Sequence, residues 1–184
     1  MYSIRRILIE GYPTLLLGAL IVTTAGIMLN SSTQELNRLP LILVMMPVVN
    51  GSAGNIGSIL GARLSSALHL GTIEPRLKGQ KLLKENILAT LLISLGTFLF
   101  ASVLFFAIGI RIGMAASSSL ALTLAFLMTG GLVSVLLVLV TVAFAFASFR
   151  GGLDPDNVVI PIMTSVMDVL GVTCLLLSVK IMGV

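Results

Sequence analysis

Five long apolar runs set the strongest limit on what this chain can fold into. Each is about 17 residues or longer, enough for a helix to cross a hydrocarbon core about 30 Å thick. Inside lipid the backbone must satisfy its own hydrogen bonds, so such runs fold as helices. The sequence therefore predicts an all-α membrane protein, with residues 1–184 as one domain and five transmembrane helices at about 13–29, 39–70, 87–110, 118–147 and 158–182.

The composition agrees with a protein that lies almost entirely within the bilayer. Of the 184 residues, 57% are hydrophobic and 10% are charged, whereas a soluble domain carries about 25% charged residues. Arg5 and Arg6 precede the first run, but this run is too long for a signal peptide and no clear cleavage site follows it. No basic run is interleaved with aromatic residues. We therefore expect a lipid membrane, and no nucleic acid, among the partners.

The basic residues predict the orientation, because cytoplasmic loops carry an excess of Lys and Arg. If the N-terminus lies inside, seven basic residues lie on the cytoplasmic side: Arg5, Arg6, Arg76, Lys78, Lys81, Lys84 and Arg150. Three then lie outside: Arg38, Arg111 and Lys180. We therefore expect a multi-pass protein of the plasma (cytoplasmic) membrane, with a cytoplasmic N-terminus and an external C-terminus.

Asp168 is the acidic residue that most needs explaining. It lies in the middle of the fifth run, and no other acidic residue falls inside an apolar run as these runs are drawn. A carboxylate at that depth costs about 2.5–3.5 kcal/mol on insertion scales. An intramembrane ionisable residue of this kind indicates a functional site, although pairing with a buried Arg or with neighbouring hydroxyls is the alternative.

The second run, residues 39–70, is longer than a membrane needs, since a straight helix of that length would measure about 48 Å. Pro47 lacks the N–H that would bond to the carbonyl of Leu43. Residues 50–57 then hold three glycines and two asparagines, which are poor helix formers. Irregular backbone at membrane depth persists only where protein buries it or water lines it. We therefore expect the second helix to be broken by this glycine-rich segment.

Small residues continue along the rest of the second run in two rows at helical spacing. The rows are Gly54, Ser58, Ala62 and Ser66, and beside them Gly57, Gly61 and Ser65. Such a face lets another backbone, or a hydrated ion, come close. Helix packing and a permeation path therefore both remain open as interpretations.

The fifth run carries a polar stripe at the same depth as the glycine-rich segment. The stripe consists of Pro161, Thr164, Asp168, Gly171 and Ser178, with Ser165 at its edge. Counting about 1.5 Å per residue places residues 51–55 about 17–22 Å from the outer end, and Asp168 about 14 Å from the outer face. The two features can therefore face one cavity.

Oxygen ligands without paired His or Cys favour a hard cation such as Mg²⁺, Ca²⁺ or Mn²⁺. Mg²⁺ sheds water reluctantly and is usually held through its water shell by one or two carboxylates. One chain supplies one central carboxylate, so a dimer with two Asp168 side chains around its axis would suit a hydrated Mg²⁺ ion.

Two stretches resemble the MgtE-type magnesium transporters and channels. Pro47-Val-Val-Asn-Gly-Ser-Ala-Gly-Asn-Ile-Gly57, followed by Ala62-Arg63 and Glu74-Pro75, is similar to the second helix of that family. Asp154-Pro-Asp-Asn-Val-Val-Ile-Pro-Ile-Met-Thr-Ser-Val-Met-Asp-Val-Leu-Gly171 is similar to its fifth helix. The resemblance is closest to the archaeal and eukaryotic solute-carrier branch, and no CBS domain is expected here.

The resemblance implies a five-helix homodimer that conducts Mg²⁺ along an axis lined by helices two and five. It matches Asp168 to the family's pore carboxylate. Together with the stripe, it gives candidate metal ligands at Asp168, Asn55, Gly51, Gly54, Ser165 and Thr164, and pore-lining positions at Asn50, Gly57, Ser58, Pro161 and Gly171. The chain departs from the bacterial pattern at Ser58-Ile59 and Ile160, so the resemblance leaves the coordination and the ion selectivity open.

Three alternatives to a Mg²⁺ pore remain. The first is a Na⁺- or H⁺-coupled exchanger that prefers another divalent metal, and the second is an accessory membrane subunit that does not transport. The third, an intramembrane aspartyl protease, needs two carboxylates that share a proton, and the stripe around Asp168 offers no second acid. We therefore expect no enzyme. At the start of the fifth run, Asp156 or Asn157 is expected to cap the helix rather than to collect cations.

Overall fold

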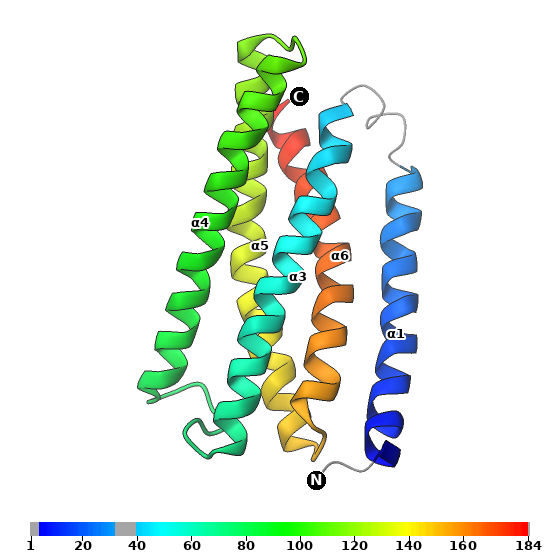
Figure 1. Ribbon diagram of the computed structural model, residues 1–184, viewed down its shortest axis with the longest axis vertical. Coiled ribbons are helices and arrows are strands. Elements are labelled where there is room, and N and C mark those ends of the chain that lie inside the picture. The colour runs from blue at the N-terminus through cyan, green and yellow to red at the C-terminus, as the bar shows by residue number, and fades with distance from the viewer. Residues whose placement is uncertain (1–3, 32–39, 184) are drawn as a thin grey trace.

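The computed structural model describes residues 4–31 and 40–183, and within them it contains five α-helices and no strand. The helices, labelled as in Figure 1, are α1 (Ile4–Ser31), α3 (Pro40–His69), α4 (Lys81–Arg111), α5 (Ala116–Arg150) and α6 (Pro155–Met182). Each is long and apolar enough to span a membrane. The predicted all-α fold with five transmembrane helices is therefore confirmed, while the single domain and the orientation stay predictions.

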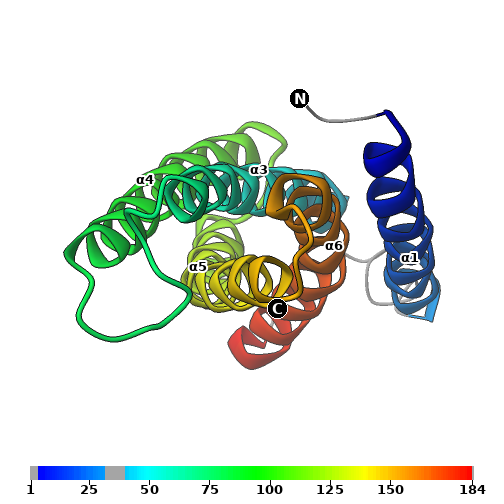
Figure 2. The ribbon, with the colours of Figure 1, turned by 90° about the horizontal axis from the view of Figure 1, so that it is seen from below.

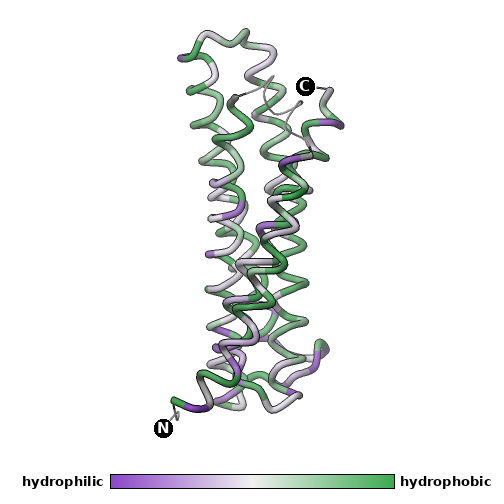
Figure 3. The backbone as a smooth tube through the Cα atoms, turned by 90° about the vertical axis from the view of Figure 1, so that its right-hand side faces the viewer, coloured by the Kyte–Doolittle hydropathy of each residue, from purple (hydrophilic) through white to green (hydrophobic). Residues whose placement is uncertain are grey.

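The helices run alternately up and down along one long axis (Figure 1). The helices α3, α4, α5 and α6 form a bundle. In the described part of the chain, α3 and α5 each contact all three of the other helices in this bundle. Among the same residues α1 contacts only α6, and Figure 2 shows it set apart on that side of the bundle. Hydrophobic residues follow most of the helix length, and hydrophilic ones gather towards the end that holds the N-terminus (Figure 3).

The bundle is held by apolar side chains at helical spacing. On α3 the inward face carries fully buried residues: Met45, Val49, Ala53, Leu60 and Leu64. Between α4 and α5, Phe126 packs against Phe98 and Phe105, with ring centroids 5.7 and 4.7 Å apart. Since lipid is as apolar as these side chains, close packing rather than escape from water stabilises the bundle in a membrane.

The second helix is continuous, which corrects the expected break. α3 is helical through residues 50–57 and past Pro47, and none of the glycines in that segment has a positive φ. Each glycine costs only about 1 kcal/mol relative to alanine, whereas an unmade backbone hydrogen bond in lipid costs several kcal/mol. The glycines therefore stay helical, and two of them, Gly54 and Gly57, allow the close approach of α6.

The starts and ends of the helices follow local chemistry. Gly113 and Gly152, with φ of 84° and 74°, follow α4 and α5 and adopt the left-handed conformation that ends many helices. At the start of α6 the cap is Asp154, whose carboxylate accepts a hydrogen bond of 3.1 Å from the Asp156 N–H. The expectation that Asp156 or Asn157 would cap this helix is therefore corrected. Pro155 fixes the first helical position and moves the cap to the residue before it.

Candidate cation site between α3 and α6

Glycines on α3 allow α6 to approach closely along the α3–α6 seam. A Cβ added at Gly57 would lie 2.8 Å from Met163 Cε, and one added at Gly61 would lie 2.9 Å from Val159 Cγ1. Both distances are shorter than real Cβ atoms show, so a side chain at Gly57 would have to displace the end of the flexible Met163 side chain, and one at Gly61 the short Val159 side chain. This part of the small-residue face of α3 therefore serves helix packing.

Gly51 and Gly54 differ in their surroundings although one helical turn separates them. A Cβ at Gly54 would lie 3.4 Å from Thr164 Cγ2, an ordinary van der Waals contact inside the seam. Gly51 is exposed, and nothing lies within 4 Å of a Cβ built there. Gly54 therefore belongs to the contact with α6, while Gly51 lies on an open surface.

Asp168 lies beside Asn50 across the same seam. The Asn50 Nδ2 donates a hydrogen bond of 3.4 Å to the backbone carbonyl of Asp168. Gly171 lies one turn further along α6, where a Cβ would collide with the Asn50 side-chain oxygen. The glycine thus makes room for the amide. The depth count from the sequence, which put the glycine-rich segment level with Asp168, is consistent with this contact.

The Asn50 side-chain oxygen is the unusual atom of this site. Oδ1 is buried and has no hydrogen-bond partner among the described residues. A buried acceptor without a partner loses about 1–3 kcal/mol of hydration without compensation, so most such groups in folded proteins are paired. An oxygen of this kind, on a residue that contacts Asp168, is suited to a cation or to a water bound to one.

The remaining predicted ligands divide between an open surface and the contact with α1. Asn55 and Thr164 are exposed and Asp168 is half-buried, so they lie on an open surface along the seam. Ser165 is buried, donates a 3.0 Å hydrogen bond to the Pro161 carbonyl, and lies against α1. A Cβ at Gly18 of α1 would come within 2.6 Å of the Ser165 Oγ.

Two further predicted pore-lining residues also have definite places. Ser58 is half-buried on α3, and its Oγ has no hydrogen-bond partner among the described residues. Pro161 is half-buried, and its carbonyl accepts hydrogen bonds from the hydroxyls of both Thr164 and Ser165 at 3.0 Å. The structure thus brings Asn50, Gly171 and Asp168 together but leaves Ser165 on another face of α6.

Charge for a metal ion is sparse within one chain. Among the described residues, no group of three or more His, Cys, Asp and Glu side chains is arranged to hold a metal ion. The seam offers one carboxylate, that of Asp168, with amide and hydroxyl oxygens around it. Such a set suits a hydrated hard cation better than a dehydrated one, because a hydrated ion keeps most of its ligands as water.

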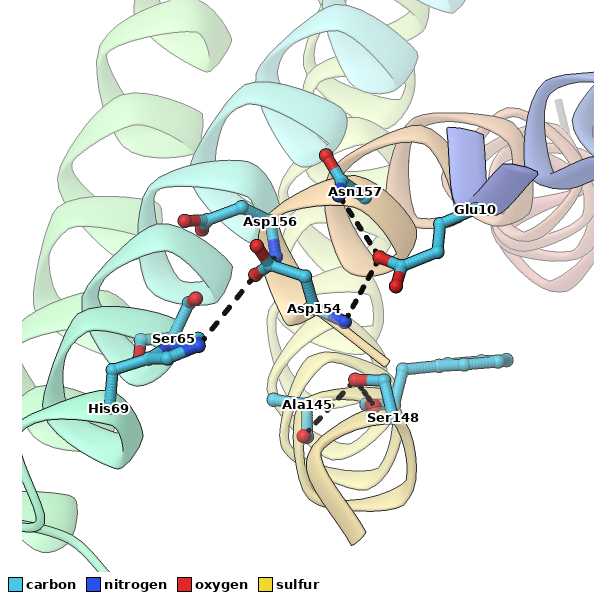
Figure 4. Close-up of polar contacts among 9 residues, drawn as sticks. Glu10, Ser65, His69, Ala145, Ser148, Asp154, Asp156 and Asn157 are labelled. Atoms are coloured by element: carbon cyan, nitrogen blue, oxygen red, sulfur yellow. Dashed lines mark hydrogen bonds and ion pairs between the residues drawn. The ribbon is translucent and has the colours of Figure 1, made fainter. Parts of the chain in front are cut away.

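A second polar cluster, which the sequence did not reveal, lies at the base of α6 (Figure 4). The carboxylate of Glu10 on α1 accepts hydrogen bonds from the Asp154 N–H at 3.2 Å and from Asn157 Nδ2 at 3.0 Å. His69 Nε2 of α3 lies 4.0 Å from the Asp154 carboxylate. Since the span of α1 begins at Leu8, Glu10 lies within it. The predicted first run begins at residue 13 and so leaves Glu10 outside it. In the structure, Asp168 is therefore not the one acid in a spanning helix.

The model of the MgtE family, described as divalent cation transporters, matches residues 46–178. The chain belongs to the MgtE family. The matched range runs from α3 to α6 and contains both Asn50 and Asp168. The resemblance read from the two motifs is therefore confirmed, and the family is described by transport rather than by catalysis.

One relative of this MgtE-family chain is solute carrier family 41 member 3 of Rattus norvegicus. The two sequences are 29% identical over 186 residues, which cover 95% of this chain and 40% of the rat protein. The chain therefore spans well under half the length of this relative. No solved structure matches the chain significantly.

Proposed function

We propose that this MgtE-family chain carries Mg²⁺ across the plasma membrane along the surface formed by α3 and α6, with Asp168 holding the hydrated ion. The coarser part of this statement, a multi-pass membrane protein of a divalent cation transporter family, rests on the five spanning helices and on the family match. The choice of Mg²⁺, the route and the binding residue are our proposal.

The observation that carries the proposal is the contact between Asn50 and Asp168. Asn50, whose buried amide oxygen has no partner among the described residues, contacts the backbone of Asp168, whose carboxylate is half-buried within a spanning helix. Each of these groups is unfavourable there in the absence of a cation. A hydrated divalent ion satisfies both, because its charge meets the carboxylate and its waters donate to the amide oxygen.

Two copies of the chain complete the proposed site. One carboxylate is too little charge for a divalent ion in a low-dielectric setting, whereas a twofold dimer supplies a formal charge of −2 from two Asp168 side chains. The open surface with Gly51 and Asn55 then faces the dimer axis. Protons compete with the metal for the same oxygens, so Mg²⁺ affinity should fall as the pH falls. Cross-linking in the membrane that yields only monomers, or an affinity that stays flat from about pH 5 to pH 8, would contradict the dimeric site.

Uptake of Mg²⁺ into proteoliposomes tests the function, with a Mg²⁺-sensing dye inside and with or without an imposed Na⁺ or H⁺ gradient. Uptake that needs no second gradient supports the proposal. Uptake that requires the Na⁺ or H⁺ gradient would replace it with a coupled exchanger. If the folded, reconstituted protein shows no Mg²⁺ uptake, the remaining function is that of an accessory subunit that does not transport.

The Asn50→Ala variant tests the carrying observation. Groups that support a metal ligand typically change affinity about tenfold or more when removed, so half-saturation should require about ten times more Mg²⁺. The matched control is Asn86→Ala on α4, because within the described residues the Asn86 amide donates to the Leu82 carbonyl of its own helix. Equal effects of the two substitutions would remove Asn50 from the ion path.

A further inference from the structure

A cavity lies between α4 and α5, at the end where residues 70–80 connect α3 to α4. Its volume is about 580 Å³, and one side of it is open. The walls are apolar and include Leu77, Ile87, Leu139 and Ala143. No residue of α3 or α6 lines it, so it is separate from the α3–α6 seam. Figure 2 shows the connecting segment passing α5 on its way from α3 to α4.

Two arginines lie at the polar rim of this cavity. Arg150, the last residue of α5, donates a hydrogen bond from its guanidinium to the Pro75 carbonyl. Arg76 is the next residue of the connecting segment, and its Nε lies 2.8 Å from the Glu74 carboxylate. The hydrogen bond from Arg150 fastens the segment across the end of the cavity and brings both side chains into its lining. Each guanidinium has more N–H donors than these contacts use.

The rim carries a positive charge that the neighbouring acids offset only in part. Glu74 pairs with Arg76, and Lys81 lies 3.7 Å from Glu85 one helical turn along α4. The other basic residues of this region are Arg150, Lys78 and Lys84. An apolar cavity beneath a cationic rim matches a molecule with an apolar chain and an anionic head. Water molecules are a poor filling for the apolar part of this cavity, because a buried water needs several polar partners.

We propose that this cavity binds an anionic phospholipid, with an acyl chain between α4 and α5 and the phosphate on Arg76 and Arg150. The planar guanidinium matches phosphate oxygens in pairs, which makes arginine well suited to this contact. The predicted orientation puts the rim at the cytoplasmic leaflet, where anionic lipids gather and basic pockets between helices bind their head groups. The site does not depend on the transport proposal, because it shares no residue with the seam.

Lipid retention measured by native mass spectrometry tests the site. The protein is purified from vesicles of equal parts phosphatidylglycerol and phosphatidylcholine. The number of molecules of each lipid that stay bound to the protein is then measured. The wild type should retain phosphatidylglycerol in preference to phosphatidylcholine. Arg150→Gln should lower that retention about fivefold, the effect of losing one hydrogen-bonding partner of the phosphate. The matched control, Lys78→Gln, removes the same charge from an exposed side chain on the same segment, outside the cavity lining, and should leave retention unchanged.

A second pair of variants keeps both arginines. Ala143→Leu fills the cavity from α5, whereas Ala107→Leu adds the same side chain to an exposed position of α4 outside it. Ala143→Leu should release phosphatidylglycerol and Ala107→Leu should not. The proposal is overturned if Lys78→Gln acts like Arg150→Gln, since the attraction would then be general. It is also overturned if Ala143→Leu retains the lipid, or if that variant changes the oligomeric state, because a second copy would then cover the cavity.

Discussion

α6 meets its two neighbours α3 and α1 through very different surfaces. Towards α3 the contact is close along its length, through Gly54, Gly57 and Gly61, and it contains Asp168. Towards α1 the polar contacts gather at one end, where Glu10 and Thr14 reach the start of α6, and one glycine contact lies further along. Over the spanning windows, 56% of α6 but only 11% of α1 is buried.

The difference shows how one helix can be fixed on one side and loosely held on the other. The α3 side depends on shape, because backbones that touch through glycine leave no room for a side chain. The α1 side combines close packing at Gly18 with a few hydrogen bonds at one end, each worth about 0.6 kcal/mol in a measured membrane protein. We therefore infer that α3 and α6 form the fixed frame around Asp168, while α1 is the helix most easily displaced.

The largest expected effect is that of Asp168→Ala, which removes the charge at the centre of the fixed frame. Mg²⁺ uptake into proteoliposomes should fall to about background. The fold should be retained, because removing a carboxylate from the middle of a membrane helix favours insertion by about 2.5–3.5 kcal/mol. The control is Asp156→Ala, which removes an exposed acid from the first turn of the same helix. Wild-type uptake by a folded Asp168→Ala protein would exclude Asp168 from the ion path.

Two leucine substitutions on α3 separate packing from permeation. Gly61→Leu overpacks the seam against Val159 and should lower the free energy of unfolding by about 1–3 kcal/mol. Gly51→Leu adds a side chain where a Cβ has no neighbour within 4 Å among the described residues, so stability should hold or rise by up to about 1 kcal/mol with the better helix former. Mg²⁺ uptake by the Gly51→Leu protein should nevertheless be blocked, because the leucine side chain fills the space at the proposed dimer axis.

Thermal unfolding in detergent and Mg²⁺ uptake, measured on both variants, decide this prediction. Gly54→Leu is a poorer probe of the path than Gly51→Leu, since Gly54 faces Thr164 inside the seam. If Gly51→Leu transports normally, the open surface of α3 does not line the path and faces lipid instead.

Glu10→Ala should act on the other side of α6. It removes the acceptor of the Asp154 N–H and of the Asn157 amide, and an unsatisfied buried donor costs about 1–3 kcal/mol. Hydrogen exchange should therefore speed up in α1 and at the start of α6, and stay unchanged in α5. Glu85→Ala, which breaks an exposed pair with Lys81 worth about 0.3–0.5 kcal/mol, should alter neither. Faster exchange throughout the bundle would mean that α1 is part of the fixed frame.

Thr14→Val should give the smallest effect. The Thr14 hydroxyl lies 3.3 Å from the Asn157 carbonyl but also donates within α1, to the Gly11 carbonyl at 2.7 Å. Valine has nearly the same shape, so the loss should be no more than about 0.6 kcal/mol, seen as a small rise in exchange of α1 alone. A loss as large as that of Glu10→Ala would mean that the Thr14 contact, rather than the carboxylate, holds α1 on α6.

The sequence by itself determined the spanning helices, the position of Asp168 within the last of them, and the family. These features depend on the length of apolar runs and on the cost of a charge in lipid, which hardly vary with the surroundings of a residue. The apolar pattern places the start of the first helix late, because its first turns carry charged residues that lower the hydropathy. The pattern therefore leaves Glu10 outside the first predicted run.

Only the tertiary structure decided how the helices face one another. It showed that α3 continues through its glycines, since in lipid the hydrogen bonds of the backbone outweigh the low helix propensity of glycine. It also separated Gly51 from Gly54, and joined Asn50 to Asp168. Each residue turns a helix by about 100°, so an uncertainty of one or two residues in register changes which side chains meet. Contact between two helices is therefore settled by their packing and not by the pattern of either one alone.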